Sequence, residues 1–381
     1  MRQTYSNVCV EGLGYVLPEE SVSSADIEAR LTPLYERLRL PAGRLELLSG
    51  IESRRFWPRG TRLSDVSVRA AALAMEAAEW PSSDIGALIH GSVCRDHLEP
   101  ATACRVHHRL KLPAACYVYD VSNACLGLLN GMLQVADLIE LGRITAGLVV
   151  GTEDARPLVE HTIESLNADR SLTRRSVKPA IASLTIGSAS CAILLAHRHR
   201  SRTGNRIVGA TVRSATDHHE LCLSVQDQAG TSMRPLMATD AEALLDGGVA
   251  TARETFAEFQ HVTGWSAAEL DRTICHQVGS AHRRRMLEVL GLDAESDHTT
   301  FSWLGNTGSA ALPVTLADAA SRNIIQRGER VALLGIGSGI NCVMLGVEWQ
   351  RSLVAKTNWP SVEGGAVLRG AAASSCESSV P

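Results

Sequence analysis

The sequence lacks the features that mark several large classes of protein. No apolar run reaches the roughly 18 residues that a membrane-spanning helix needs, because residues 146–150 and 331–336 are only long enough for strands. Basic residues are not in excess, since 37 Lys and Arg stand against 41 Asp and Glu and the net charge is -4. We therefore expect a soluble protein with no membrane span, no nucleic-acid partner and a small ligand.

Metal-binding and disulfide patterns are also missing. The ten cysteines include no CxxC pair, and the 13 histidines include no HExxH motif or other metal-ligand spacing. The chain opens without the pattern of a secretory signal peptide. The sequence therefore predicts reduced thiols, a cytoplasmic location, no metal and no cofactor of its own.

What the sequence does contain is a large apolar fraction in a repeated order. Hydrophobic residues make up 45% of 381, enough for two domains or for one large domain made of two similar halves. Residues 141–151 and 327–335 both read as a helix end, a glycine, an apolar strand and a second glycine. We predict two copies of one unit, at 1–200 and 205–350, with the site at their junction. The Ala/Gly/Ser-rich tail, 355–381, is predicted to be disordered.

Cys125 lies where a predicted strand, 116–121, runs into an apolar helix, 126–141. Asp, Ser and Asn residues that favour helix N-caps precede it. The helix dipole and free backbone N–H groups at such a joint favour thiolate over thiol by up to about 2 kcal/mol, which predicts a nucleophile. The alternative, a small core side chain, has equal weight from this stretch alone.

His276 and Asn306 occupy similar positions. His276 follows the predicted strand 272–275, and Asn306 lies in a turn of small residues that opens a predicted helix, 312–326. A thiolate can accept an acyl group, while imidazole and carboxamide N–H groups can stabilise an oxyanion. Cysteine proteases also combine Cys, His and Asn, but the duplicated strand and helix pattern favours acyl transfer to carbon.

Two further segments are candidates for the site. Glu99 lies in a polar cluster, 93–100, between a predicted strand and helix, where it is either a functional carboxylate or a residue that only complements the helix dipole. The glycine run at 335–339 lacks GxGxxG spacing and leads into a strand, which excludes a dinucleotide loop. Glycine there allows backbone N–H groups to approach a ligand closely.

Three of these segments carry a family resemblance. The segments 122–127 (SNACLG), 276–277 (HQ) and 305–310 (GNTGSA) resemble the Cys, His and Asn motifs of the thiolase superfamily, specifically the β-ketoacyl-acyl-carrier-protein synthase III group. The motifs have the same order and separation, and the similarity runs over 8–349. Within the group, the chain is most similar to the enzymes of bacterial olefin biosynthesis that condense two fatty acyl-CoAs.

The resemblance implies an α/β fold of the five-layered αβαβα type and a homodimer in which Glu99 of one subunit acts as base in the other subunit's site. It implies that Cys125 is acylated by a first acyl-CoA and that His276 and Asn306 bind the carbonyl of the second. The backbone N–H groups implied for the oxyanion hole belong to Cys125 and to Gly337, Ser338 and Gly339. Synthase III enzymes commonly have His-Gln-Ala-Asn, whereas here Gly279 replaces the asparagine.

Three functions stay open at this point. The first is a non-decarboxylating Claisen condensation of two long-chain fatty acyl-CoAs, for which Glu99 is the discriminating residue. The second is a synthase III that extends an acyl group with a malonyl carrier protein, or an acyltransferase on the same scaffold. The third is a non-catalytic partner subunit, against which the joint presence of Cys, His and Asn argues.

The sequence does not decide between coenzyme A and acyl carrier protein as the donor. Candidates to hold the phosphates of coenzyme A are Arg54, Arg55 and Arg284, although a pair of arginines is also typical of a solvated surface turn.

Overall fold

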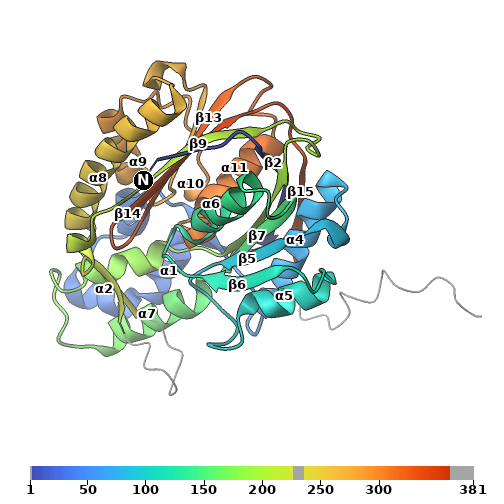
Figure 1. Ribbon diagram of the computed structural model, residues 1–381. Coiled ribbons are helices and arrows are strands. Elements are labelled where there is room, and N and C mark those ends of the chain that lie inside the picture. Colours follow the sequence, from blue (N-terminus) through green and yellow to red (C-terminus); the bar gives the residue numbers. More distant parts are fainter. Residues whose placement is uncertain (1, 226–235, 361–381) are drawn as a thin grey trace, which may run out of the picture.

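The computed structural model describes residues 2–225 and 236–360, and its centre is one large mixed sheet (Figure 1). Across the sheet the strands follow the order β6 (Tyr117–Val121), β5 (Ala87–Gly91), β7 (Ala146–Glu153), β8 (Ala189–His197), β2 (Val8–Pro18), β9 (Arg206–Ser214), β14 (Asn341–Glu348), β13 (Arg330–Gly337) and β12 (Arg272–Cys275). Two short strands attach to this path: β1 (Arg2–Thr4) pairs with β9, and β15 (Val354–Trp359) pairs with β2.

The sheet has two halves with the same strand order and directions. In the first half, β5 is parallel to β7, β7 is antiparallel to β8, and β8 is antiparallel to β2. In the second half, β12, β13, β14 and β9 repeat these relations in turn. A single residue pair, Cys9 and Arg206, joins β2 to β9. The repeated pattern in the sequence therefore has a structural counterpart, while the division at 200–205 stays a prediction.

Helices form the other layers. α6 (Gly127–Glu140) and α11 (Ala311–Ser321) lie inside, and their apolar side chains join strands of both halves in one core. α4 (Leu63–Ala78) and α5 (Thr102–Leu110) pack on the outer face of the first half, and α8 (Ala241–Thr263) packs on the outer face of the second, beside α9 (Ser280–Leu290). Figure 1 shows α6 and α11 enclosed while α8 lies on the outside. Helices and sheet halves thus alternate in five layers.

The apolar composition of α6 explains its central place. Leu, Met, Val and Ile occupy nearly every face of this helix, so it is stable only when it is enclosed. Gly131 lets it approach β7 closely, because a Cβ there would lie 2.6 Å from Cγ1 of Val149. The position of α6 matters for the site because Cys125 immediately precedes it.

The N-terminal region forms a smaller helical unit. Ser23 and Asp26 have the spacing of a capping box, and the structure confirms it, because each satisfies the other's backbone N–H at the start of α1 (Ser24–Arg30). The sequence pattern predicts one helix from this box to Leu38, which is wrong, because α2 (Thr32–Leu38) begins separately with a proline in its first turn. The remaining elements are α3 (Arg44–Ser49), α7 (Arg156–Ala168), α10 (Phe301–Leu304), β3 (Glu20–Ser23), β4 (Ser53–Phe56), β10 (Cys222–Val225), β11 (Leu236–Thr239) and short 3₁₀ helices at Ser82–Asp84, Lys178–Thr185, Thr216–His218, Ala267–Glu269 and Gly308–Ala310.

The prediction of a disordered tail from residue 355 is wrong for 355–359. These residues belong to β15, which runs parallel to β2 from Val354 opposite Leu13 to Trp359 opposite Pro18. Trp359 also meets Trp57 edge to face, with 6.5 Å between ring centroids. The rest of the predicted tail, 361–381, lies outside the described residues. The segment with Gly230, Met233 and Pro235, whose lack of a clear period predicts a long loop, lies outside them too.

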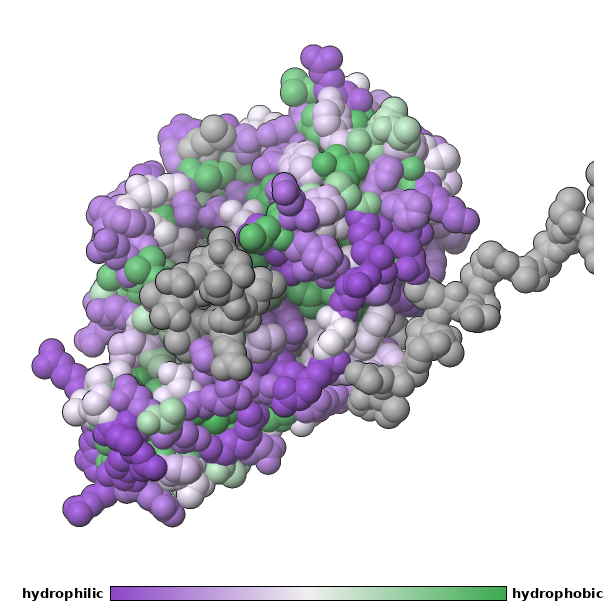
Figure 2. All heavy atoms as spheres, turned by 90° about the horizontal axis from the view of Figure 1, so that it is seen from below, coloured by the Kyte–Doolittle hydropathy of each residue, from purple (hydrophilic) through white to green (hydrophobic). Residues whose placement is uncertain are grey.

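Within 2–225 and 236–360, no helix is both long and apolar enough to cross a membrane. The face seen in Figure 2 is mainly hydrophilic, and hydrophobic residues occur on it in small groups between polar ones.

Candidate active site

The candidate residues follow the carboxyl ends of parallel strands, where open α/β sheets bind ligands. β6 leads to the loop of Cys125, β12 leads directly to His276, and β13 ends at Gly337. β5 leads to the loop that carries Glu99. Contacts between these loops, described below, bring residues from both halves of the sheet together.

Cys125 lies on a tight turn just before α6. Ala124 has a left-handed backbone with φ 44°, and α6 begins at Gly127 with Leu126 as its N-cap residue. The predicted side-chain cap is absent at this helix, and Cys125 precedes the first helical turn instead of lying within it. Gly127 packs directly on β5, since a Cβ on Gly91 would lie 2.5 Å from its carbonyl carbon.

The pKa of Cys125 moves in the direction opposite to the prediction. Burial of the thiol, followed by the negative charge of Glu153, raises the pKa of Cys125 from 9.0 to about 12. The residue keeps some accessible surface, but its sulfur is surrounded by protein atoms that solvate a thiolate poorly. The prediction of a thiolate stabilised by the helix is therefore wrong for the ligand-free protein, because burial disfavours the thiolate more than the backbone hydrogen bond at Cys125 favours it.

The glycine turn 337–339 lies against the cysteine turn. A Cβ on Gly337 would lie 3.6 Å from the backbone nitrogen of Cys125, so the two backbones are close together. The Nδ2 group of Asn341 lies 3.4 Å from Oδ1 of Asn123 and 3.3 Å from the carbonyl oxygen of Ser338, and it donates to both. This contact joins the nucleophile loop of the first half to the glycine turn of the second.

His276 is buried and uncharged. Burial, and then the neighbouring His282, lower the pKa of His276 to about 3. Its ring is perpendicular to that of His282, with 6.5 Å between centroids, and burial lowers the pKa of His282 to about 4. In the described residues, the His276 imidazole has no hydrogen-bond partner, and Nδ1 of His282 is buried without one. A neutral imidazole presents one N–H donor to a ligand.

The next residue, Gln277, holds His276 in place. Its Nε2 donates to the carbonyl of Cys275 at 2.6 Å, and its Oε1 accepts from the backbone N–H of Thr300 at 2.8 Å and of Phe301 at 3.2 Å. Phe301 begins the short helix α10, which precedes the Asn306 loop. The buried Gln277 amide therefore ties the histidine loop to the segment that leads to the asparagine.

Asn306 is fixed by its backbone and by one side of its amide. Its backbone N–H donates to Thr185 at 3.0 Å, and its carbonyl accepts from Gly187 at 3.0 Å. Its Oδ1 accepts from the backbone N–H of Gly308 at 3.0 Å. Because the carbonyl end of the carboxamide is occupied, the Nδ2 end remains as the donor, which is the polarity that an oxyanion requires.

Glu99 is exposed on the loop 93–100, away from any partner that would bury it. Two apolar residues of the same loop are also exposed, Val93 by 47% and Leu98 by 58%. Exposed apolar side chains on such a loop are typical of a contact surface. A single chain thus leaves the carboxylate of Glu99 in solvent.

The three candidate arginines have different environments. Arg54 is fully buried, and its NH1 donates to Oγ of Ser24 at 3.1 Å and to the carbonyl of Val22 at 3.4 Å. Burial lowers the pKa of Arg54 to about 10. Its prediction as a phosphate ligand is wrong, because the guanidinium lies within the protein. Arg55 donates to the carbonyl of Pro18 at 2.9 Å, and Arg284 is exposed on α9, so both stay predictions.

Gly279 has a structural reason to replace the asparagine of the related motif. Its φ is 154°, and a Cβ there would lie 2.6 Å from the carbonyl oxygen of Ser49. The end of α3 therefore packs where a side chain would begin. His282 lies one helical turn further along α9, beside His276.

Glu153 is a buried residue of the site that the sequence analysis passed over. Its carboxylate accepts hydrogen bonds from backbone N–H groups of Val93 and Ser309 and lies 2.5 Å from Oγ of Ser309. An acidic residue at the end of the apolar strand 146–153 is the signal that could have found it. His282 and Asn341 had no signal, because their roles depend on packing between distant segments.

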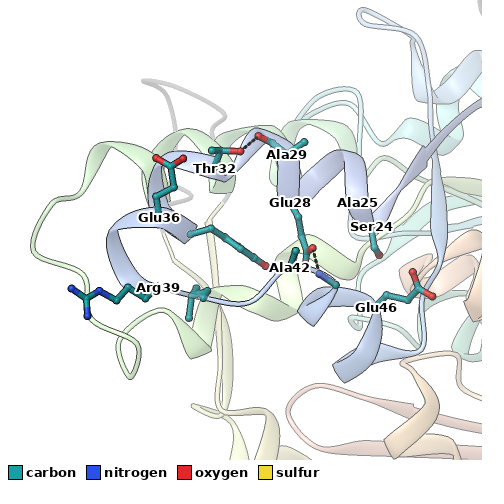
Figure 3. A pocket seen from close by; sticks show the side chains of 12 residues that line it. Ser24, Ala25, Glu28, Ala29, Thr32, Glu36, Arg39, Ala42 and Glu46 are labelled. Carbon is teal, nitrogen blue, oxygen red and sulfur yellow. Dashed lines mark hydrogen bonds between the residues drawn. The ribbon is translucent and has the colours of Figure 1, made fainter.

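A separate surface pocket lies among α1, α2 and α3 and shares no residue with this site (Figure 3). Glu28 points into it, but the Glu28 carboxylate already accepts from the backbone N–H groups of Gly43 and Leu45. Within the part of the chain that the structure describes, no three His, Cys, Asp or Glu residues are grouped to hold a metal ion.

Comparisons with known proteins agree over most of the chain. Residues 261–349 match the family model of the 3-oxoacyl-[acyl-carrier-protein (ACP)] synthase III C terminal. The acyl-CoA:acyl-CoA alkyltransferase of Shewanella oneidensis is 41% identical over 349 residues, which cover 91% of this chain and 99% of that protein. The protein of the same name from Xanthomonas campestris is 35% identical over 345 residues, with the same two coverages.

Solved structures give the same result. OleA of Xanthomonas campestris, with a cysteine replaced by serine and with bound lauric acid and lauroyl-CoA, has a TM-score of 0.85 and 34% identity. The match covers 91% of this chain and 100% of that chain. The cerulenin-bound form has a TM-score of 0.86, 35% identity, and coverages of 91% and 98%.

Proposed function

The chain belongs to the acyl-CoA:acyl-CoA alkyltransferases, condensing enzymes of the thiolase fold, and we propose that it joins two long-chain fatty acyl-CoAs without decarboxylation. The observation that carries the proposal is the arrangement of the loops. A cysteine from one half lies against a glycine turn from the other. In the second half, a neutral imidazole follows strand β12, and a carboxamide with a free donor end follows the short helix α10. These are the groups that acyl transfer through a thioester requires.

In the first step, Sγ of Cys125 attacks the thioester carbonyl of one acyl-CoA. The bond from the acyl carbon to the sulfur of coenzyme A breaks, and the thiol proton ends on the departing coenzyme A. The raised pKa of Cys125 favours loss of this proton together with formation of the new bond. Backbone N–H groups of Cys125 and of Gly337, Ser338 and Gly339 form the oxyanion hole for the acyl oxygen.

In the second step, Glu99 removes an α-proton from the second acyl-CoA. His276 and Asn306 donate hydrogen bonds to the carbonyl oxygen of that thioester, on which negative charge develops. The resulting α-carbon attacks the acyl group on Cys125, the bond to Sγ breaks, and the sulfur regains a proton. The product is a 2-alkyl-3-ketoacyl thioester.

Glu99 acts in trans in a homodimer. Glu99 is exposed in one chain, and the loop that carries it presents the apolar side chains of Val93 and Leu98. β6 forms one outer edge of the main sheet and leads to the Cys125 loop, and its Tyr117 is 53% exposed. A second copy against this edge covers the apolar groups and brings Glu99 toward the partner's cysteine.

A cytoplasmic location, the absence of a metal and of any cofactor, and acyl carrier protein as an alternative donor stay predictions. Arg55 and Arg284 stay candidates for the phosphates of coenzyme A.

The test uses purified protein and myristoyl-CoA, with and without a malonyl donor. Intact-protein mass spectrometry should show a myristoyl adduct that is lost in Cys125→Ala, and product analysis should show a β-keto product without any malonyl donor. A product that appears only with the malonyl donor would favour the decarboxylating synthase instead. An adduct that persists in Cys125→Ala would refute the assigned nucleophile.

Glu99→Gln separates the two steps. We expect this variant to acylate Cys125 at a near-normal rate but to form almost no β-keto product. A heterodimer of Glu99→Gln with Cys125→Ala should regain one working site, built from the first subunit's Cys125 and the second subunit's Glu99. No recovery in the heterodimer would contradict the trans arrangement.

A further inference from the structure

Glu153 is a buried carboxylate between two loops of the site. It is the last residue of β7, is 5% exposed, and has no salt-bridge partner in the described residues. Its Oε1 accepts from the backbone N–H of Val93 at 3.0 Å, and its Oε2 accepts from that of Cys94 at 3.3 Å. Val93 and Cys94 form the base of the loop that carries Glu99.

The same carboxylate holds the Asn306 loop. Oε1 accepts from the backbone N–H of Ser309 at 3.3 Å and lies 2.5 Å from Oγ of Ser309. Ser309 belongs to the 3₁₀ helix Gly308–Ala310, whose first N–H donates to Oδ1 of Asn306. Gly308 packs on the carboxyl group, since a Cβ there would lie 3.1 Å from Cγ of Glu153.

All the neighbours of this carboxylate are donors. Three backbone N–H groups and one hydroxyl point to its two oxygens, and a carboxylate can accept about four hydrogen bonds. The hydroxyl of Ser309 also lies 2.9 Å from the carbonyl oxygen of Gly91, so the contact extends from the Asn306 loop to the end of β5. The Glu153 carboxylate therefore holds both the start of the Glu99 loop and the Asn306 loop. Neither loop can move at this point without affecting the other.

We propose that Glu153 is a positioning residue for two active sites at once, its own through Asn306 and the partner's through Glu99. This inference rests on the proposed function, because it requires that Glu99 acts in trans. It assigns Glu153 no contact with substrate. The geometry of each site then depends on Glu153 of its own subunit and on Glu153 of the partner subunit.

Glu153→Gln is the informative substitution, because it keeps the volume and changes one acceptor into a donor. The amide can keep its oxygen toward Val93 and Ser309, and its NH₂ group then faces the N–H of Cys94. This substitution should therefore disturb the Glu99 loop more than the Asn306 loop. Ser309→Ala removes the hydroxyl contact and disturbs only the Asn306 side.

The experiment uses heterodimers in which one subunit carries Cys125→Ala, so that one site works. With Glu153→Gln in the Cys125→Ala subunit, the working site receives its Glu99 from the altered subunit. We expect normal acylation and a roughly tenfold slower condensation, the size of effect typical of losing a hydrogen bond to a charged group. With Ser309→Ala in place of Glu153→Gln, the slowing should appear only when the substitution is in the subunit that keeps Cys125.

Asp154→Asn is the matched control. Asp154 is a half-buried acid that directly follows β7, but its side chain accepts from Ser188 and from the N–H of Arg156, and it bonds to neither loop. Thermal unfolding of each heterodimer shows whether the subunits remain folded. A general loss of stability would slow condensation equally from either subunit, and this result would overturn the inference.

These heterodimers distinguish a failure of the Glu153 role from a failure of the trans arrangement. If Glu99→Gln and Cys125→Ala subunits do not complement each other, the trans arrangement itself is wrong. If they do complement, while Glu153→Gln in the Cys125→Ala subunit leaves condensation unchanged, the positioning role of Glu153 alone is refuted.

Discussion

The raised pKa of Cys125 predicts that the ligand-free enzyme is slow to react with alkylating agents. Burial, with a smaller contribution from Glu153, raises this pKa from 9.0 to about 12. At pH 8 a thiol with a pKa of 9.0 is about one-tenth ionised, whereas one with a pKa of 12 is ionised in about one molecule in ten thousand. Because only the thiolate reacts, alkylation of Cys125 should be roughly a thousandfold slower than that of an ordinary cysteine.

The assay is a time course with iodoacetamide from pH 6 to pH 10, followed by peptide mass spectrometry. Cys104 is exposed on α5 and provides an internal reference in the same sample. Cys125 should show no plateau over this range, and its rate should still rise at pH 10. Modification of Cys125 as fast as Cys104, with a midpoint below about pH 8, would mean that the helix dipole outweighs burial.

Three further predictions concern the second half of the molecule. Asn306→Ala should slow β-keto product formation by roughly 10²-fold or more, measured at saturating acyl-CoA, because one oxyanion donor is lost; a wild-type rate would exclude this role. His276 and His282 have lowered pKa values, so the unfolded chain binds more protons than the folded chain below about pH 6.5. The free energy of unfolding should therefore fall as the pH falls from about 6.5 toward about 3. Urea titrations at pH 7.5 and 5.5 should show this fall, and His282→Gln should reduce it. Gly279→Asn should destabilise the protein by about 1–3 kcal/mol in the same titrations, because its side chain meets the carbonyl of Ser49; unchanged stability would mean that α3 can move away.

The residues whose surroundings are local were predictable from the sequence. Cys125 and His276 each follow a strand, and Asn306 lies in a turn of small residues, so turn and strand signals placed them without knowledge of the tertiary fold. The repeated order of helix, glycine and strand likewise predicted two halves, and the strand directions agree with it.

The environments that depend on distant segments were not predictable. The pKa of Cys125 depends on how much protein surrounds its sulfur, and Arg54 is buried with its guanidinium donating to Val22 and Ser24. β15 forms because β2, far away in the sequence, offers a free edge for pairing. The composition of the β15 segment gave no sign that it would pair as a strand. Glu153 was missed for the same reason, since its partners come from two loops on either side of it in the chain.

The contact between Asn123 and Asn341 makes the onset of activity a consequence of complete folding. The cysteine is encoded in the first half of the chain, and the glycine turn, imidazole and carboxamide are encoded in the second. During synthesis, a nascent chain therefore carries its thiol for as long as the second half takes to be made, without the groups that complete the site.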